Sequence, residues 1–182
     1  MQLANSPHAY GVIAKVFHWV VVAFVLVGWF LGTFGDDLPR GAARDLGLFI
    51  HITAGLLVLA LFLPRLLWRV VDAPPAPEPL PFGRWAEHLA TIAHYALYAL
   101  VLAVPLAGIA TQFARGDALP VLGLFSIPSP MAATRATARL VKEVHEVLAN
   151  ALLILALLHA AAALFHHWVL RDRTLVRMLP GR

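Results

Sequence analysis

Hydrophobic residues fall in four long runs separated by more polar stretches, and this pattern predicts four membrane-spanning helices. Each run has about 20 residues or more, which is enough for a helix to cross the ~30 Å hydrocarbon core of a bilayer. The expected spans are residues 12–34, 46–71, 88–113 and 140–169. An even number of spans puts both ends of the chain on one side of the membrane.

The connections between these runs differ in length and chemistry. The first is a polar turn at residues 35–45, and the second is proline-rich, at 72–84, which favours an extended path. The third, at 114–139, is the longest and partly apolar, so it is expected to hold a short re-entrant or interfacial helix. We expect an all-α protein, a single integral membrane domain over residues 1–182 with a transmembrane four-helix bundle as its fold.

Composition supports the membrane assignment. Hydrophobic residues make up 60% of the chain and charged residues 13%, about half of the ~25% that is usual in soluble domains. The net charge of +4 therefore indicates loop charge at a membrane surface and not nucleic-acid binding. The chain has no cysteine, which excludes disulfides, iron–sulfur clusters, thiolate-bound haem and covalent haem attachment.

Lysine and arginine residues predict the orientation of the bundle. Eight of them lie on the side of the two termini and six on the other side, so both termini are expected in the cytoplasm. The six on the outer side are Arg40, Arg44, Arg115, Arg135, Arg139 and Lys142.

Seven of the nine histidines lie in or near the spans, where a buried ionisable side chain is costly and usually faces a partner or a cavity. His51 and His145 begin spans on the outer side, whereas His18, His94 and His159 lie toward the inner side. His145 and His159 are two heptads apart, so they share one helix face about 21 Å apart along the axis. Depth therefore pairs His51 with His145, and His159 with either His18 or His94.

Two imidazoles from facing helices suit the iron of an electron-transferring b haem, so the pairing predicts two stacked haems. Zinc is a weaker alternative, because no carboxylate or cysteine lies at matching depth. A further alternative is that each histidine only bonds a backbone carbonyl. Small residues near the histidines, such as Gly28 and Gly32, would let a flat macrocycle or a neighbouring helix approach closely.

Several motifs resemble the bacterial cytochrome b561 family. They are FHW at 17–19, FIHITAG at 49–55, VPLAG at 104–108, ARGD at 114–117, KEVHEVLAN at 142–150, LLHAAAALFHHW at 157–168 and DRTLVRMLP at 172–180. The resemblance implies a bundle with two b haems in the bacterial inner membrane. It implies His18 and His159 as ligands of the inner haem, and His51 and His145 as ligands of the outer haem. His94 would then lie beside the inner haem, near a propionate or a quinone.

Small four-helix members of this family look like superoxide:ubiquinone oxidoreductases, so the resemblance implies superoxide as electron donor and ubiquinone as acceptor. The outer basic residues Arg135, Arg139 and Lys142 would then attract the superoxide anion. His166, one heptad past His159, would bond a quinone carbonyl and help to pass its proton. One alternative is an anchor subunit that relays electrons between a partner dehydrogenase or hydrogenase and quinone. The other is a membrane protein that binds no haem and contacts only membrane lipid.

Overall fold

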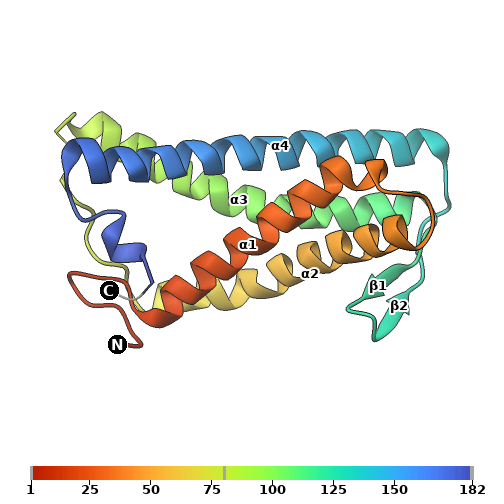
Figure 1. Ribbon diagram of the computed structural model, residues 1–182, viewed down its shortest axis with the longest axis horizontal. Helices are drawn as coiled ribbons and strands as arrows, with labels where there is room; N and C mark the ends of the chain where they lie inside the picture. Colours follow the sequence, from red (N-terminus) through yellow and green to blue (C-terminus); the bar gives the residue numbers. More distant parts are fainter. Residues whose placement is uncertain (1, 80, 181–182) are drawn as a thin grey trace.

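The computed structural model describes residues 2–79 and 81–180, and four long helices dominate it (Figure 1). They are α1 (Val12–Phe34), α2 (Ala42–Val71), α3 (Arg84–Ala114) and α4 (Arg135–Phe165). All four are long and apolar enough to cross a membrane, so the four expected helices are present. Helices α2, α3 and α4 begin four or five residues before the predicted apolar runs. Their first turns are polar, so an apolar pattern does not include them.

The bundle has two distinct ends (Figure 1). The described ends of the chain, residues 2–11 and 171–180, lie at the same end, which we call the terminal end. The opposite end carries strands β1 (Leu119–Val121) and β2 (Phe125–Ile127), and we call it the hairpin end. The connection between the first and second helices also lies there.

The expected interfacial helix in the third connection is wrong, because the segment forms an antiparallel β-hairpin with Leu119 opposite Ile127. Leu122 and Gly123 take the turn with φ angles of 52° and 74°, and the Leu124 N–H donates to the Val121 carbonyl at 2.9 Å. Two consecutive positive φ angles are typical of the tight hairpin turn that matches the twist of paired strands. The apolar residues of this segment therefore belong to strands.

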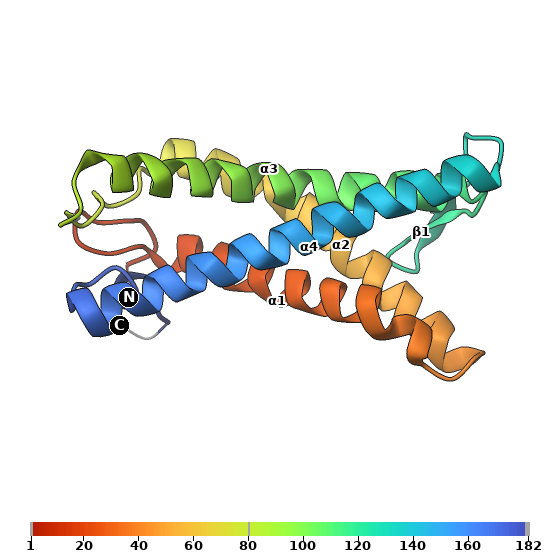
Figure 2. The same cartoon turned by 90° about the horizontal axis from the view of Figure 1, so that it is seen from above.

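The helices pack as two antiparallel pairs. α1 runs beside α2 and α3 beside α4, while contacts between α2 and α3 join the two pairs. α1 and α4 touch little. Figure 2 shows α3 and α4 converging toward the hairpin end, so these two helices are farthest apart at the terminal end.

The buried core of the bundle is small. Within the described helices it consists mainly of Val21, Ala54, Val58, Phe62 and Leu152. Large apolar side chains are instead exposed on the outer faces, as with the 63% exposed Leu63 and the 77% exposed Val70. Such a surface suits lipid, which solvates apolar side chains while each helix satisfies its own backbone. The interior between the helices is left with room for cavities.

Segments that are distant in sequence close the terminal end. The Asn5 backbone N–H donates to the Asp72 carboxylate at 2.8 Å, and the Asn5 side-chain amide donates to the Asp72 carbonyl at 3.0 Å. Arg177 pairs with Glu78 at 2.7 Å and donates to the Ala76 carbonyl at 2.8 Å. The N-terminal segment and the C-terminal tail are thus both fixed to the proline-rich connection.

Candidate functional site

At the hairpin end, the imidazoles of His51 on α2 and His145 on α4 face each other. Their ring centroids are 6.0 Å apart and their planes are at 89°. Nδ1 of His51 lies 2.7 Å from the Gly28 carbonyl oxygen on α1, and Nδ1 of His145 lies 3.0 Å from the Val104 carbonyl oxygen on α3. Because a carbonyl only accepts, each Nδ1 carries the proton, and both Nε2 atoms remain available to bind a metal.

This pair lies in a cavity of about 660 Å³, within the ~300–1,000 Å³ that is usual for small-molecule and cofactor sites. All four helices contribute to its walls, which are mostly apolar. Its charged lining residues are three basic and three acidic: Arg44, Arg115, Lys142, Asp36, Asp45 and Glu146. The formal charges of this lining therefore balance.

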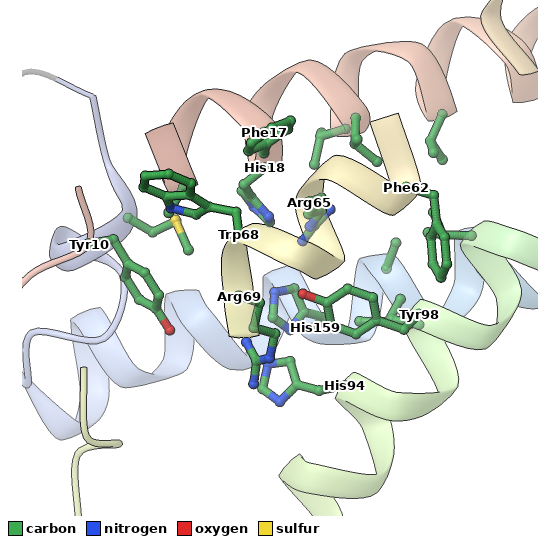
Figure 3. A pocket seen from close by; sticks show the side chains of 18 of the residues that line it. Tyr10, Phe17, His18, Phe62, Arg65, Trp68, Arg69, His94, Tyr98 and His159 are labelled. Atoms are coloured by element: carbon green, nitrogen blue, oxygen red, sulfur yellow. The ribbon is translucent and has the colours of Figure 1, made fainter. Parts of the chain in front are cut away.

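At the terminal end, three histidines from three helices point toward one another (Figure 3). The ring centroids of His18 on α1 and His159 on α4 are 6.4 Å apart. His94 on α3 lies closer to His159, at 5.3 Å. The three rings line a second cavity, of about 210 Å³, together with Arg65 and Arg69 of α2.

The two arginines give this second cavity its chemistry. Arg65 and Arg69 are one helical turn apart, and their guanidinium groups lie 5.2 and 5.7 Å from the centroid of the Tyr98 ring, a cation–π arrangement. Trp68 also lines the cavity, and its Nε1 is buried with no acceptor among the described residues. Two cations and a spare donor suit a ligand with carboxylates.

Sequence reasoning did not find Arg65, Trp68 and Arg69 as site residues, since it counted both arginines as loop charge. A signal was available, because charged residues four positions apart at the end of an apolar run usually face a cavity or a partner.

The centroid distances differ between the imidazole pairs. Two axial imidazoles on opposite sides of one iron have centroids roughly 6 Å apart, since each metal–nitrogen bond is about 2 Å and each ring centre lies about 1 Å further out. The 6.0 and 6.4 Å pairs are close to that span, and the 5.3 Å between His94 and His159 is shorter than it. No group of three or more His, Cys, Asp or Glu side chains in residues 2–79 and 81–180 is placed to hold a metal ion.

Apolar side chains separate the two cavities. Val25, Val101, Leu152 and Leu153 line both of them, so these four residues form a shared wall. The two imidazole sites are therefore stacked along the bundle, one above the other, on either side of this wall.

The sequence profile of the prokaryotic cytochrome b561 family matches residues 9–181. The chain belongs to this family. It is 33% identical over 185 residues to Cytochrome b561 homolog 2 of Escherichia coli K12, an alignment that covers 98% of this chain and 95% of that protein. It is 34% identical to Probable superoxide oxidase CybB of Yersinia pestis, covering 91% of this chain and 92% of that protein. It is 32% identical to Cytochrome b562 of Cereibacter sphaeroides, covering 91% of each.

These similarities confirm the expected family and the coarse function. The chain is a prokaryotic membrane cytochrome of the b561 family, and membership in a cytochrome b family implies haem b as cofactor. The mostly apolar cavities with facing imidazoles and nearby cations fit that group, because a haem b needs axial nitrogen ligands, an apolar slot and partners for two propionates.

The three basic residues predicted to attract an anion differ in position. Arg135 is the exposed first residue of α4. Arg139 is 83% exposed and bonds Glu143 at 2.8 Å. Lys142 lines the hairpin-end cavity, where it bonds Glu146 at 2.5 Å.

The basic residues of the hairpin end are matched by acidic ones. Six acidic residues accompany the six basic residues there: Asp36, Asp37, Asp45, Asp117, Glu143 and Glu146. Any attraction of an anion to this end must therefore come from the local arrangement of cations and not from net charge.

His166 is engaged with the C-terminal tail. It begins the helical turn η2 (His166–Leu170) that follows α4, and its Nδ1 lies 2.5 Å from the Asp172 carboxylate. Burial alone would raise the pKa of the Asp172 carboxyl, but hydrogen bonds from the Thr174 N–H and from His166 hold that pKa below its ordinary value. His166 lines neither of the two cavities described above, so its ring is placed beside the tail and not beside His159.

Proposed function

We propose that this cytochrome holds two b haems and moves electrons across the membrane from superoxide at the hairpin end to ubiquinone. His51 and His145 would bind the iron at the hairpin end, and His18 and His159 would bind it at the terminal end. The observation that carries the proposal is the pair of centroid distances, 6.0 and 6.4 Å, in two cavities stacked along one bundle. His94 would lie beside the second haem without binding its iron.

The polar residues around each pair would hold the acidic groups of the cofactor. At the terminal end, the Arg65 and Arg69 guanidinium groups and the free Trp68 Nε1 would bond the propionates. At the hairpin end, Arg115 would do so. When bound, the haems would supply one-electron redox centres, while the protein sets their spacing and surroundings.

The apolar wall between the cavities explains why electrons would cross without ions. Buried water and ions need polar partners, and Val25, Val101, Leu152 and Leu153 offer only hydrocarbon side chains. The histidines on the two sides of this wall are about 21 Å apart along α4. Electron tunnelling needs no polar partner, so the wall passes electrons and excludes protons and water.

The reaction balances with two superoxide anions for each quinone. Each superoxide gives up one electron and leaves as oxygen, and ubiquinone takes two electrons and two protons to become quinol. Support for superoxide comes from one relative, named Probable superoxide oxidase CybB. Lys142 at the cavity, with the exposed Arg135 and Arg139 nearer the N-terminus of α4, would attract the anion locally.

A quinone site near His166 is part of the proposal. Because Nδ1 of His166 faces Asp172, its Nε2 is the nitrogen that would bond a quinone carbonyl. The carboxylate would keep the proton on Nδ1 and fix the orientation of the ring. The terminal end would face the cytoplasm of a bacterial inner membrane, since it carries seven of the 13 lysine and arginine residues in the described part of the chain.

The test uses the purified, haem-loaded chain without any partner. A superoxide generator and a ubiquinone analogue are added, and haem reduction, quinol formation and superoxide loss are followed together. Superoxide should reduce the haem, and quinone should accelerate superoxide loss, with His145→Ala as the inactive control. If superoxide neither reduces the haem nor disappears faster with quinone, while an added dehydrogenase does reduce it, the chain is an anchor subunit.

A further inference from the structure

The imidazole ring of His51 packs against one turn of the neighbouring helix α1. Its Nδ1 bonds the Gly28 carbonyl at 2.7 Å. Its Cε1 lies against Gly32, where an added Cβ would come within 2.9 Å of it. Only a residue without a side chain leaves room for the ring at this position.

The imidazole ring of His145 packs against α3 in the same way. Its Nδ1 bonds the Val104 carbonyl at 3.0 Å, and a Cβ at Gly108 would lie 3.1 Å from its Cε1. The two contact sites belong to different helix pairs, yet each combines an accepting carbonyl with a glycine four residues later.

The spacing of four residues explains why the carbonyl and the glycine can both contact the same imidazole ring. Residues four apart on a helix lie on the same face, one above the other. A glycine four residues after an accepting carbonyl leaves a flat helix surface on which the imidazole ring can lie while its Nδ1 bonds that carbonyl. Cε1 lies between Nδ1 and Nε2, so a methyl group pressed against it would displace both the hydrogen-bonding nitrogen and the metal-binding nitrogen.

The terminal-end imidazoles have different surroundings. Among the described residues, no hydrogen bond joins His18 or His159 to a carbonyl or a carboxylate. Their cavity is instead lined by the cations Arg65 and Arg69. The two imidazole pairs therefore differ in basicity and in nearby charge.

We propose that Gly32 and Gly108 are positioning residues that hold His51 and His145 against their carbonyls and so keep the potential of the hairpin-end haem below that of the other haem. The inference rests on the proposed haem ligation. A hydrogen bond donated from Nδ1 makes the imidazole a more basic ligand, which favours the oxidised iron. The cations at the terminal end favour the reduced iron. Electrons that enter at the hairpin end would then run energetically downhill.

The test measures both haem potentials in Gly32→Ala and Gly108→Ala by redox titration of the haem absorbance. The lower potential should rise in both variants, and the higher should stay unchanged. The rise should be larger in Gly32→Ala, because its methyl group would lie closer to the ring; a tenfold change in the reduction equilibrium corresponds to about 59 mV. The EPR signal of the same haem should also change, because this signal depends on the angle between the His51 and His145 ring planes, which is 89° in the parent chain. Ala23→Val, on the exposed face of α1 and away from both cavities, should change neither potential.

Other results of the glycine variants also support or contradict the proposal. Loss of one haem in Gly32→Ala, with the higher-potential haem kept, also supports the proposal. Two unchanged potentials, equal shifts of both, or loss of both haems in the glycine variants overturns it. The titration uses neither superoxide nor quinone, so it does not depend on the proposed substrates, and a colourless parent protein would refute the haem ligation itself.

Discussion

The indole Nε1 of Trp29 on α1 donates a hydrogen bond to Oδ1 of Asn150 on α4 over 3.1 Å. Since these two helices otherwise touch little, this bond bridges the two helix pairs beside the hairpin-end cavity. We predict that Asn150→Leu lowers the free energy of unfolding by about 1 kcal/mol, measured as the denaturant midpoint of haem release. Trp29→Phe should have a similar effect. If the double variant loses the full sum of the two single losses, the bond does not carry the stability.

The tail clasp between Arg177 and Glu78 gives a second prediction. The two side chains are 13% and 21% exposed, so the ion pair is shielded from solvent better than a surface pair. Arg177→Gln should lower the free energy of unfolding by about 1.5 kcal/mol and make residues 171–180 more accessible to protease. Arg173→Gln, on the exposed part of the same tail, is the matched control. Equal protection of the tail in both variants would contradict the clasp.

The hydrogen bonds to Asp172 predict how the stability of the tail depends on pH. The pKa of this carboxyl is lowered in the folded chain, so its contribution is complete above the unfolded value of about 3.9 and is lost only as pH falls through the lower folded pKa. Asp172→Asn should therefore cost about 1 to 2 kcal/mol at neutral pH, and the difference in thermal midpoint from the parent should persist to about pH 4.

The control for this pH profile is Asp117→Asn, a carboxyl that is 55% exposed at the hairpin end and that should cost little at any pH. A difference between Asp172→Asn and the parent that disappears at a pH well above about 4 would show that the Asp172 carboxylate does not control the tail.

Position relative to the cavity should decide which cation attracts superoxide. Lys142 lines the hairpin-end cavity, while Arg139 points into solvent with 83% of its side chain exposed. Lys142→Glu should slow haem reduction by superoxide about tenfold at low salt, and the effect should shrink as salt screens the charge. Arg139→Glu adds the same charge change and should slow the reaction less. Stopped-flow rates that fall equally in both variants would favour a diffuse field over a local one.

The helical part of the fold could be predicted from the sequence because apolar run length is a strong signal in a membrane protein. The run at residues 12–34 has the bounds of α1. The 119–127 hairpin was missed because its apolar residues were taken for an interfacial helix. Its signal is Gly123 between two short strands, a turn residue that needs a positive φ angle.

The candidate site was predictable only in part. Depth along the spans brought His51 to His145 and left His18 and His94 as alternatives, because residue spacing gives height but not the direction in which a side chain points. His159 lies 6.4 Å from His18 and 5.3 Å from His94, measured between ring centroids, and the choice of His18 as the second ligand stays a prediction. The carbonyl partners at Gly28 and Val104 could not be predicted, since every residue has a carbonyl and helix packing decides which one meets an imidazole.

The most direct test of the account is the number of haems bound per chain in His18→Ala and His94→Ala, measured on purified protein as the pyridine haemochrome. The account predicts two haems in the parent chain and in His94→Ala, and one in His18→Ala with the hairpin-end haem retained. One haem in His94→Ala together with two in His18→Ala would contradict it.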